Sequence, residues 1–183
     1  MKKILAFGAS NSRSSINKTF AIYAASQLKN VAVSVADLND YAAPIYSVDL
    51  EKAAGINEQV LRFYNLIKRS DAIVISVAEH NGLHTSAFKN LWDWLSRIPM
   101  EKPMNVWGGK PMFLLSTSPS RRPMSNVLKV SKEIFPHFGA NIIASFQLPS
   151  FNHFFRDGQI IAAKYQAEFE VQKDHFQKHL DAL

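Results

Sequence analysis

The residues with the clearest chemical potential lie in a polar loop, residues 8–17, that follows a short apolar run. The loop contains four serines, two asparagines and one arginine, Arg13, and a helical pattern begins at residue 18. Backbone N–H groups and the positive end of a helix dipole meet at such a junction and attract anions. Hydroxyls and a guanidinium add donors that suit phosphate oxygens. The loop therefore predicts a phosphate site; the alternative is that its serines only cap the helix.

Two more polar segments, residues 78–86 and 116–124, also follow apolar runs. The first contains Asn81 and Gly82, a pair that favours a tight turn with positive φ and exposes backbone N–H groups. The second is rich in hydroxyls and carries Arg121 and Arg122.

The loop at residues 8–17 lacks the glycine pattern of dinucleotide folds and the Gly-Lys-Ser/Thr of nucleoside triphosphatases. It therefore suits a single terminal phosphate better than a pyrophosphate or a triphosphate.

The elements that position these loops are five apolar runs separated by helical patterns. The sequence predicts strands over residues 4–7, 31–37, 71–77, 111–117 and 141–146. Helices are predicted over residues 18–28, 56–69, 86–97, 125–138 and 162–180. Alternating strands and helices predict an α/β fold with a parallel sheet and right-handed crossovers. Ligands of such sheets bind at the carboxyl ends of the strands, so we expect the three polar loops to line one crevice.

Two of the loops resemble those of the NADPH-dependent FMN reductase family of flavodoxin-like proteins, which includes quinone, azo-dye and chromate reductases. Gly8, Ser15 and Asn17 match the family pattern Gly-Ser-x-Arg-x-x-Ser-x-Asn. The second pattern, Pro-Glu-Tyr-Asn-Gly followed by Leu-Lys-Asn-x-x-Asp-Trp, is matched in register by Glu79, Asn81, Gly82, Lys89, Asn90, Asp93 and Trp94. The resemblance implies a flavodoxin-like three-layer sandwich with a five-stranded parallel sheet in the order 2-1-3-4-5 and helices on both faces. It also implies one FMN-binding domain over residues 1–183.

The chain departs from the family patterns at several positions. The first loop is one residue longer, which moves Arg13 closer to Ser15, and Ala9 stands where the pattern has serine. Ala78 and His80 replace the usual proline and tyrosine of the second pattern. Residues 120–124 occupy the place of a glycine-rich turn and contain no glycine.

The resemblance implies FMN as the bound cofactor and NADPH or NADH as the cosubstrate. The implied phosphate-binding residues are Ser10, Arg13, Ser15, Ile16 and Asn17. Glu79, His80, Asn81 and Gly82 would bind the edge of the flavin ring, and Ser116, Thr117 and Ser118 would flank it. No catalytic side chain is implied, because hydride transfer to a flavin needs no general base from the protein. Arg121 and Arg122 are candidates for the extra phosphate of NADPH, with a solvated basic loop as the alternative.

The implied activity is reduction of bound FMN by NAD(P)H, followed by reduction of a quinone, free flavin, azo dye or similar small acceptor. Two alternatives stay open. A flavodoxin-like electron carrier is one, although flavodoxins tend to be acidic and this chain has a formal net charge of +6. The other is a flavin-free binding or assembly protein, and the glycine-free segment 120–124 supports it.

Composition narrows the classes of partner. The basic residues are scattered pairs rather than a stripe, so we expect no nucleic-acid partner. The chain has no cysteine, which excludes disulfides, and its apolar segments are too short for a membrane span. We therefore expect a cytoplasmic protein without a membrane partner, and the resemblance implies a homodimer or homotetramer.

Smaller features carry weaker expectations. His80 and His84 straddle a predicted turn without a third histidine nearby, so we expect no metal site. Trp92 and Trp94 lie on different faces of one helix, so we expect one in the core and the other at a subunit contact. The insert at residues 38–55 is long for a connection. It is expected either to reach over a neighbouring subunit's flavin or line the substrate mouth, or to pack its aromatic residues.

Overall fold

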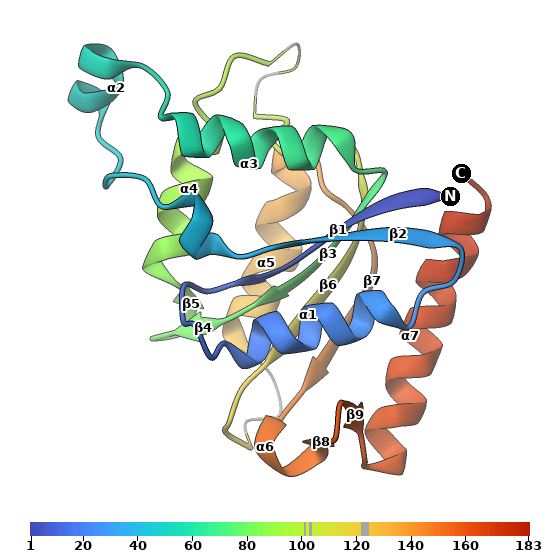
Figure 1. The fold of residues 1–183 in the computed structure, drawn as a ribbon. Coiled ribbons are helices and arrows are strands. Elements are labelled where there is room, and N and C mark those ends of the chain that lie inside the picture. Colours follow the sequence, from blue (N-terminus) through green and yellow to red (C-terminus); the bar gives the residue numbers. More distant parts are fainter. Residues whose placement is uncertain (101, 103, 122–124) are drawn as a thin grey trace.

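The structure is a computed structural model that describes residues 1–100, 102, 104–121 and 125–183. A five-stranded sheet in the order β2-β1-β3-β6-β7 forms its centre, and all neighbouring strands are parallel (Figure 1). The strands are β1 (Lys2–Ala9), β2 (Val31–Ala36), β3 (Ala72–Val77), β6 (Pro111–Thr117) and β7 (Asn141–Leu148). They correspond to the five predicted strands, and their order confirms the predicted 2-1-3-4-5 topology.

Helices cover both faces of the sheet, which confirms the predicted three-layer sandwich (Figure 1). One face carries α3 (Glu58–Arg69), α4 (Ser86–Leu95) and α5 (Asn126–Ile134). The other carries α1 (Ile16–Ser26) and α7 (Ala163–Asp181). The predicted helix over residues 125–138 is shorter, because Pro136 lies in a short 3₁₀ turn, η2 (Phe135–Phe138), that follows α5.

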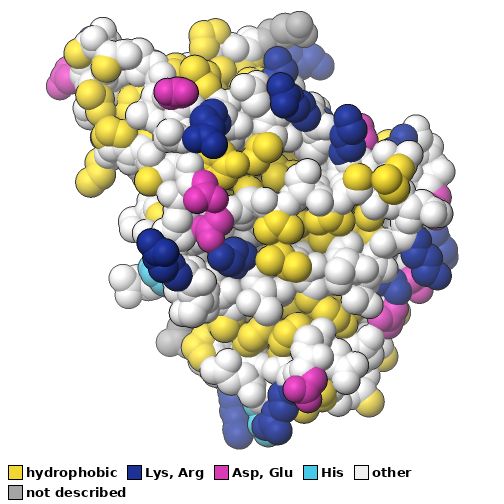
Figure 2. Space-filling view, viewed as in Figure 1, with side chains coloured by type: hydrophobic (Ala, Val, Ile, Leu, Met, Phe, Trp, Pro, Cys, Tyr) yellow, Lys and Arg dark blue, Asp and Glu magenta, His cyan; other side chains and the backbone are white. Residues whose placement is uncertain are grey.

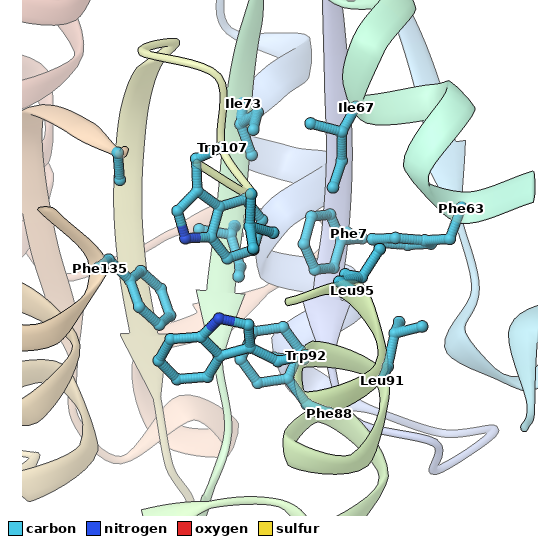
Figure 3. Packing of buried hydrophobic residues seen from close by; sticks show 14 of the residues in the cluster. Phe7, Phe63, Ile67, Ile73, Phe88, Leu91, Trp92, Leu95, Trp107 and Phe135 are labelled. Atoms are coloured by element: carbon cyan, nitrogen blue, oxygen red, sulfur yellow. The ribbon is translucent and has the colours of Figure 1, made fainter. Parts of the chain in front are cut away.

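The core beneath α3, α4 and α5 is strongly aromatic (Figure 3). Phe7 of β1 meets Phe63 of α3 edge-on at 5.2 Å between ring centroids. Trp92 packs edge-on against Phe135 at 5.1 Å. Trp94 is also buried, with 1% of its surface exposed, so the expectation that only one of Trp92 and Trp94 lies in the core is wrong. The insert covers the second tryptophan, because the Nε1–H of Trp94 donates to the carbonyl oxygen of Pro44 at 2.8 Å.

The insert at residues 38–55 forms two elements that the sequence did not predict, η1 (Leu38–Tyr41) and α2 (Val48–Ala54). Helix α2 projects from the body of the molecule (Figure 1), and none of its residues is buried. The segment before it is fastened to α4, since the Asn90 side chain accepts from the N–H of Tyr46 at 2.8 Å and donates to the carbonyls of Ala43 and Pro44. The insert also packs its aromatic residues, since Tyr41 contacts Phe63 and Tyr46 contacts Trp94, each at 5.1 Å between ring centroids; this confirms the packing expectation.

The remaining short elements are β4 (Glu79–His80), β5 (Leu83–His84), α6 (Phe151–Phe154), β8 (Phe155–Arg156) and β9 (Gln159–Ile160). Strands β4 and β5 form a hairpin after β3, and β8 and β9 form another before α7. The first hairpin lies at the carboxyl edge of the sheet, beside the loop that follows β1 (Figure 1).

Candidate functional site

Hydrogen bonds join the stems of the three polar loops at the carboxyl edge of the sheet. The Thr85 hydroxyl, after the β4–β5 hairpin, donates to the carbonyl of Ala9 at the end of β1 at 2.9 Å. The Asn17 side chain joins the first loop to Thr117, the last residue of β6. These bonds hold the loops after β1, β3 and β6 around one place on the protein surface.

The first loop combines buried serines that shape it with exposed donors. Ser15 caps α1 by accepting from the N–H of Lys18 at 3.2 Å, and Ser10 accepts from the N–H of Ser12 at 3.2 Å. Ser10 and Ser15 are buried, whereas Ser12, Arg13 and Ser14 are exposed. Ile16 and Asn17 open the helix, so their N–H groups point out of its first turn. The loop thus presents backbone donors, hydroxyls and one guanidinium to a common anion.

Gly8 lets α1 approach the sheet closely. A Cβ atom at this position would lie 2.4 Å from the backbone nitrogen of Lys18 and 2.6 Å from its Cα. Such a contact is far inside van der Waals distance, so any other residue would push the helix N-terminus away from β1. The glycine of the family pattern therefore fixes where the N–H groups of the cradle lie.

Asn17 acts as a brace rather than as a free amide. Its Oδ1 accepts from the Ser76 hydroxyl at 2.7 Å and from the N–H of Thr117 at 3.1 Å. Its Nδ2 donates to the carbonyl of Thr117 at 3.1 Å. With 4% of its surface exposed, Asn17 links α1, β3 and β6 in the interior. Only its backbone N–H is directed toward the cradle.

The second loop is the tight turn that the sequence predicts. Asn81 has φ 53° and Gly82 has φ 85°, and together they connect β4 to β5. Positive φ at both central residues is characteristic of a type I′ hairpin, which explains why the sequence places asparagine and glycine there. Asn126 of α5 donates from Nδ2 to the carbonyl of Gly82 at 2.7 Å and so holds the turn in place.

Glu79 contributes to the site through α5. Its Oε2 accepts from the Ser125 hydroxyl at 2.9 Å and from the N–H of Val127 at 3.0 Å. A carboxylate is favourable at a helix N-terminus, because the N–H groups there carry partial positive charge. The side chain of Glu79 thus connects the second loop to the start of the helix that follows the third loop.

The two histidines of the second loop have different surroundings. His80 is exposed beside the turn. His84 is half-buried among aromatic rings, stacks on Phe135 at 5.5 Å between centroids, and shares a hydrogen bond of 2.8 Å with the Ser131 hydroxyl. Burial lowers the pKa of His84 to about 4, with a smaller contribution from the positive charge of Lys89. His84 is therefore a neutral packing residue at physiological pH.

The third loop is held at its stem by hydroxyl groups. Ser116 donates to the carbonyl of Val77 at 2.9 Å, and Thr117 donates to the carbonyl of Leu148 at 2.7 Å. Both hydroxyls are buried, whereas Ser118 is half-buried and Arg121 is exposed. Arg122, predicted together with Arg121 to meet the extra phosphate of NADPH, lies outside the described residues, as do residues 123 and 124.

Sequence reasoning missed the residues that tie the loops together. Thr85 is buried, caps α4 by accepting from the N–H of Phe88, and fastens the second loop to the first. Its position directly before a helical pattern is a recognisable capping signal. Ser125 caps α5 by accepting from the N–H of Leu128, which is also a recognisable signal, but its bond to Glu79 and the bond of Ser76 to Asn17 join residues distant in sequence.

The surface is consistent with the scattered charge in the sequence. On the face shown in Figure 2, Lys and Arg side chains occupy several separate places and mix with Asp and Glu. No helix within the described residues is long and apolar enough to cross a membrane. The described residues also contain no group of three potential metal ligands among His, Cys, Asp and Glu.

Comparison with known proteins agrees with this architecture. A family model described as NADPH-dependent FMN reductase matches residues 2–153 and confirms the resemblance that the loop motifs indicate. A quinone reductase of Escherichia coli K12 is 32% identical over 94 residues, which are 51% of this chain and 45% of that protein. An NAD(P)H-dependent FMN reductase of Pseudomonas aeruginosa is 33% identical over 91 residues, which are 50% of this chain and 45% of that protein. The matched region thus spans less than half of the length of these relatives.

Among solved structures, the flavoenzyme NAD(P)H:acceptor oxidoreductase FerB of Paracoccus denitrificans superposes with a TM-score of 0.71. The superposition covers 98% of this chain and 99% of FerB at 23% sequence identity. An azoreductase of Bacillus anthracis superposes with a TM-score of 0.60 at 18% identity, over the full length of both chains. These similarities show the flavodoxin-like fold.

Proposed function

Because this chain belongs to the NADPH-dependent FMN reductase family, we propose that it binds FMN and uses NADPH or NADH to reduce a small-molecule acceptor. A quinone, a free flavin or an azo dye is the expected class of acceptor. The observation that carries this proposal is the joining of three loops by Asn17 and Thr85 at the carboxyl edge of the sheet. Ligands of doubly wound folds bind at this edge.

The first loop would hold the FMN phosphate. Ser10 and Ser15 shape the cradle, the backbone N–H groups of Ile16 and Asn17 face the anion, and Arg13 adds a charge. The fit is favourable, because Arg13 is exposed and the N–H groups of Ile16 and Asn17 lie in the first turn of α1, where no helical carbonyl accepts from them. In this proposal Asn17 contributes its backbone to the phosphate and its side chain to the brace.

The second and third loops would hold the flavin ring. The turn at His80, Asn81 and Gly82 presents main-chain groups, and Ser118 lies at the rim of the opposite loop. Glu79, Ser116 and Thr117 would act indirectly, since their side chains are bonded inside the protein. A bound FMN would supply the redox chemistry, so the protein has to bind, orient and exclude water.

The experiment compares FMN with riboflavin, which lacks the phosphate. We expect the purified protein to quench FMN fluorescence with an affinity at least about tenfold higher than its affinity for riboflavin, a free-energy difference of about 1.4 kcal/mol. Arg13→Ala should narrow that ratio by weakening FMN alone. Arg69→Ala is the matched control, because Arg69 is an exposed arginine at the last turn of α3 and should leave the ratio unchanged.

Turnover then separates the proposal from its alternatives. The FMN-loaded protein should oxidise NADPH or NADH in the presence of 1,4-benzoquinone. FMN binding without nicotinamide oxidation would instead identify a flavodoxin-like carrier. Failure to bind FMN would overturn the proposal in favour of a flavin-free binding or assembly protein.

We also propose that residues 1–183 act as one domain in a cytoplasmic homodimer or homotetramer. A hollow of about 310 Å³ between α4 and α5 supports assembly, because apolar side chains such as Trp92, Val130, Ile134 and Phe138 line it. The cytoplasmic location follows from the proposed use of a nicotinamide reductant. Light scattering coupled to gel filtration gives the mass in solution; a monomer at micromolar concentration would refute the oligomer.

A further inference from the structure

A groove runs along the outer edge of β7, on surface that the phosphate loop after β1 does not line. It has a volume of about 850 Å³ and lies between α5, β7 and α7, and we call it the edge groove. Its lining residues are Arg121, Leu128, Lys129, Lys132, Ser145, Phe146, Gln147, Pro149, Lys164, Tyr165, Glu168, Val171 and Gln172. Its size falls within the range of small-molecule and cofactor sites, which is about 300–1,000 Å³.

The edge groove is strongly basic. Arg121, Lys129, Lys132 and Lys164 line it, and all four are exposed, against a single carboxylate, Glu168. Glu168 lies 3.9 Å from Lys164, a long and exposed pair. Within the part of the chain that the structure describes, the other three cations form no ion pair. A concave surface with this excess of positive charge attracts an anion.

The walls of the groove suit a small ligand better than an added strand. Gln172 of α7 accepts from the N–H of Ser145 on β7 at 3.2 Å, so a side chain already covers part of the exposed strand edge. The half-buried ring of Tyr165 offers flat apolar surface beside the cations. Aromatic surface combined with amides and cations fits a nucleobase with attached phosphates.

The edge groove begins at the third loop of the candidate site. Arg121 belongs to that loop and also lines the groove, and the N–H of Ser150, next to the lining residue Pro149, donates to the carbonyl of Ser120 at 2.9 Å. A ligand whose one end reaches the third loop can therefore place its other end in the groove without leaving the protein surface.

We propose that the edge groove binds the adenosine 2′,5′-bisphosphate part of NADPH and thereby selects NADPH over NADH. The inference rests on the proposed function and adds the preference between the two cosubstrates. The 2′-phosphate, which NADH lacks, is a monoester with about −1.5 to −2 charges at pH 7 and suits Lys129 and Lys132. Arg121, in the third loop, suits the phosphate that leads toward the nicotinamide.

The test measures binding of adenosine 2′,5′-bisphosphate and of 5′-AMP by calorimetry, with the protein at low salt. The bisphosphate should bind at least about tenfold more tightly than 5′-AMP. Lys129→Ala combined with Lys132→Ala should abolish that difference. Lys52→Ala combined with Lys178→Ala is the matched control, since both lysines are exposed on other surfaces and the change in net charge is the same.

Steady-state kinetics provide the second measurement. The Lys129→Ala/Lys132→Ala variant should raise the KM for NADPH at least about tenfold while leaving the KM for NADH unchanged. Equal bisphosphate affinity in this variant and in the wild type would overturn the inference. An equal loss of bisphosphate affinity in the Lys52→Ala/Lys178→Ala control would also overturn it. Preferential binding of an acidic peptide or of a single-stranded oligonucleotide would also overturn it. The calorimetry needs neither FMN nor turnover. Bisphosphate binding without nicotinamide oxidation would therefore contradict the proposed function but would still support the groove as the bisphosphate site.

Discussion

Replacing Asn17 by alanine distinguishes a brace from a ligand. The change removes three hydrogen bonds between the first loop and the residues Ser76 and Thr117. A buried hydrogen bond contributes about 1 kcal/mol net, so the free energy of unfolding of the flavin-free protein should fall by about 3 kcal/mol. Ser76 is fully buried, and its hydroxyl would lose one partner, which works in the same direction. Such a loss is a large fraction of the roughly 5–15 kcal/mol that stabilises a typical domain.

Urea denaturation without flavin measures this effect, and Asn152→Ala on the exposed side of α6 provides the control, with an expected change within about 0.5 kcal/mol. Asn17→Ala should also lower the affinity for FMN, because the third loop would lose its hydrogen bonds to the first loop. If the side chain instead bound the phosphate, FMN affinity would fall while the stability of the flavin-free protein stayed the same. A change in the free energy of unfolding below about 1 kcal/mol would therefore refute the brace.

Gly8→Ala should lower the free energy of unfolding by about 1–3 kcal/mol, because the new methyl group would lie 2.4 Å from the Lys18 nitrogen; an unchanged urea midpoint would show that α1 tolerates the shift. Thr85→Ala should lower the free energy of unfolding by about 1–2 kcal/mol, because it removes the cap of α4. Thr85→Ser keeps the hydroxyl and should retain most of that free energy. An equal decrease in both variants would argue against a role of the hydroxyl. The folded-state pKa of His84 is lowered from 6.5 to about 4, so the unfolded chain takes up the proton first and stability should fall as the pH drops from about 6.5 toward 4. His84→Phe should flatten that part of the pH profile in urea titrations, and an unaltered slope would contradict the assignment.

The fold was predictable where the sequence is apolar. All five strands of the sheet are runs that the core buries, and the helices between them carry apolar residues at helical spacing. Helix α2 escaped prediction because it buries no residue, so its sequence has no apolar stripe to detect. The burial of both Trp92 and Trp94 was not predicted, because Pro44 and Tyr46 of the insert also cover Trp94.

The edge of the sheet that holds the candidate site was predictable, but the role of each side chain within the site was not. Polar loops after strands indicate where a ligand binds, and Asn81 and Gly82 indicate a turn with positive φ, which the structure confirms. The bonded roles of Asn17 and Glu79 depend on partners 100 and 46 residues away, which no local pattern reveals. A polar residue in a binding motif can thus serve the site by holding another loop.

The glycine-free third loop was the sequence feature that most favoured a flavin-free protein. Glycine is required where the backbone takes positive φ or where another group approaches very closely. The glycines are missing from residues 120–124, of which the structure describes Ser120 and Arg121, and neither of these two residues has positive φ. The loop stem is positioned by the Ser116 and Thr117 hydroxyls and by the Asn17 amide, all of which bond to main-chain groups. Because side chains fix this stem, the stem needs no glycine to hold its place beside the first loop.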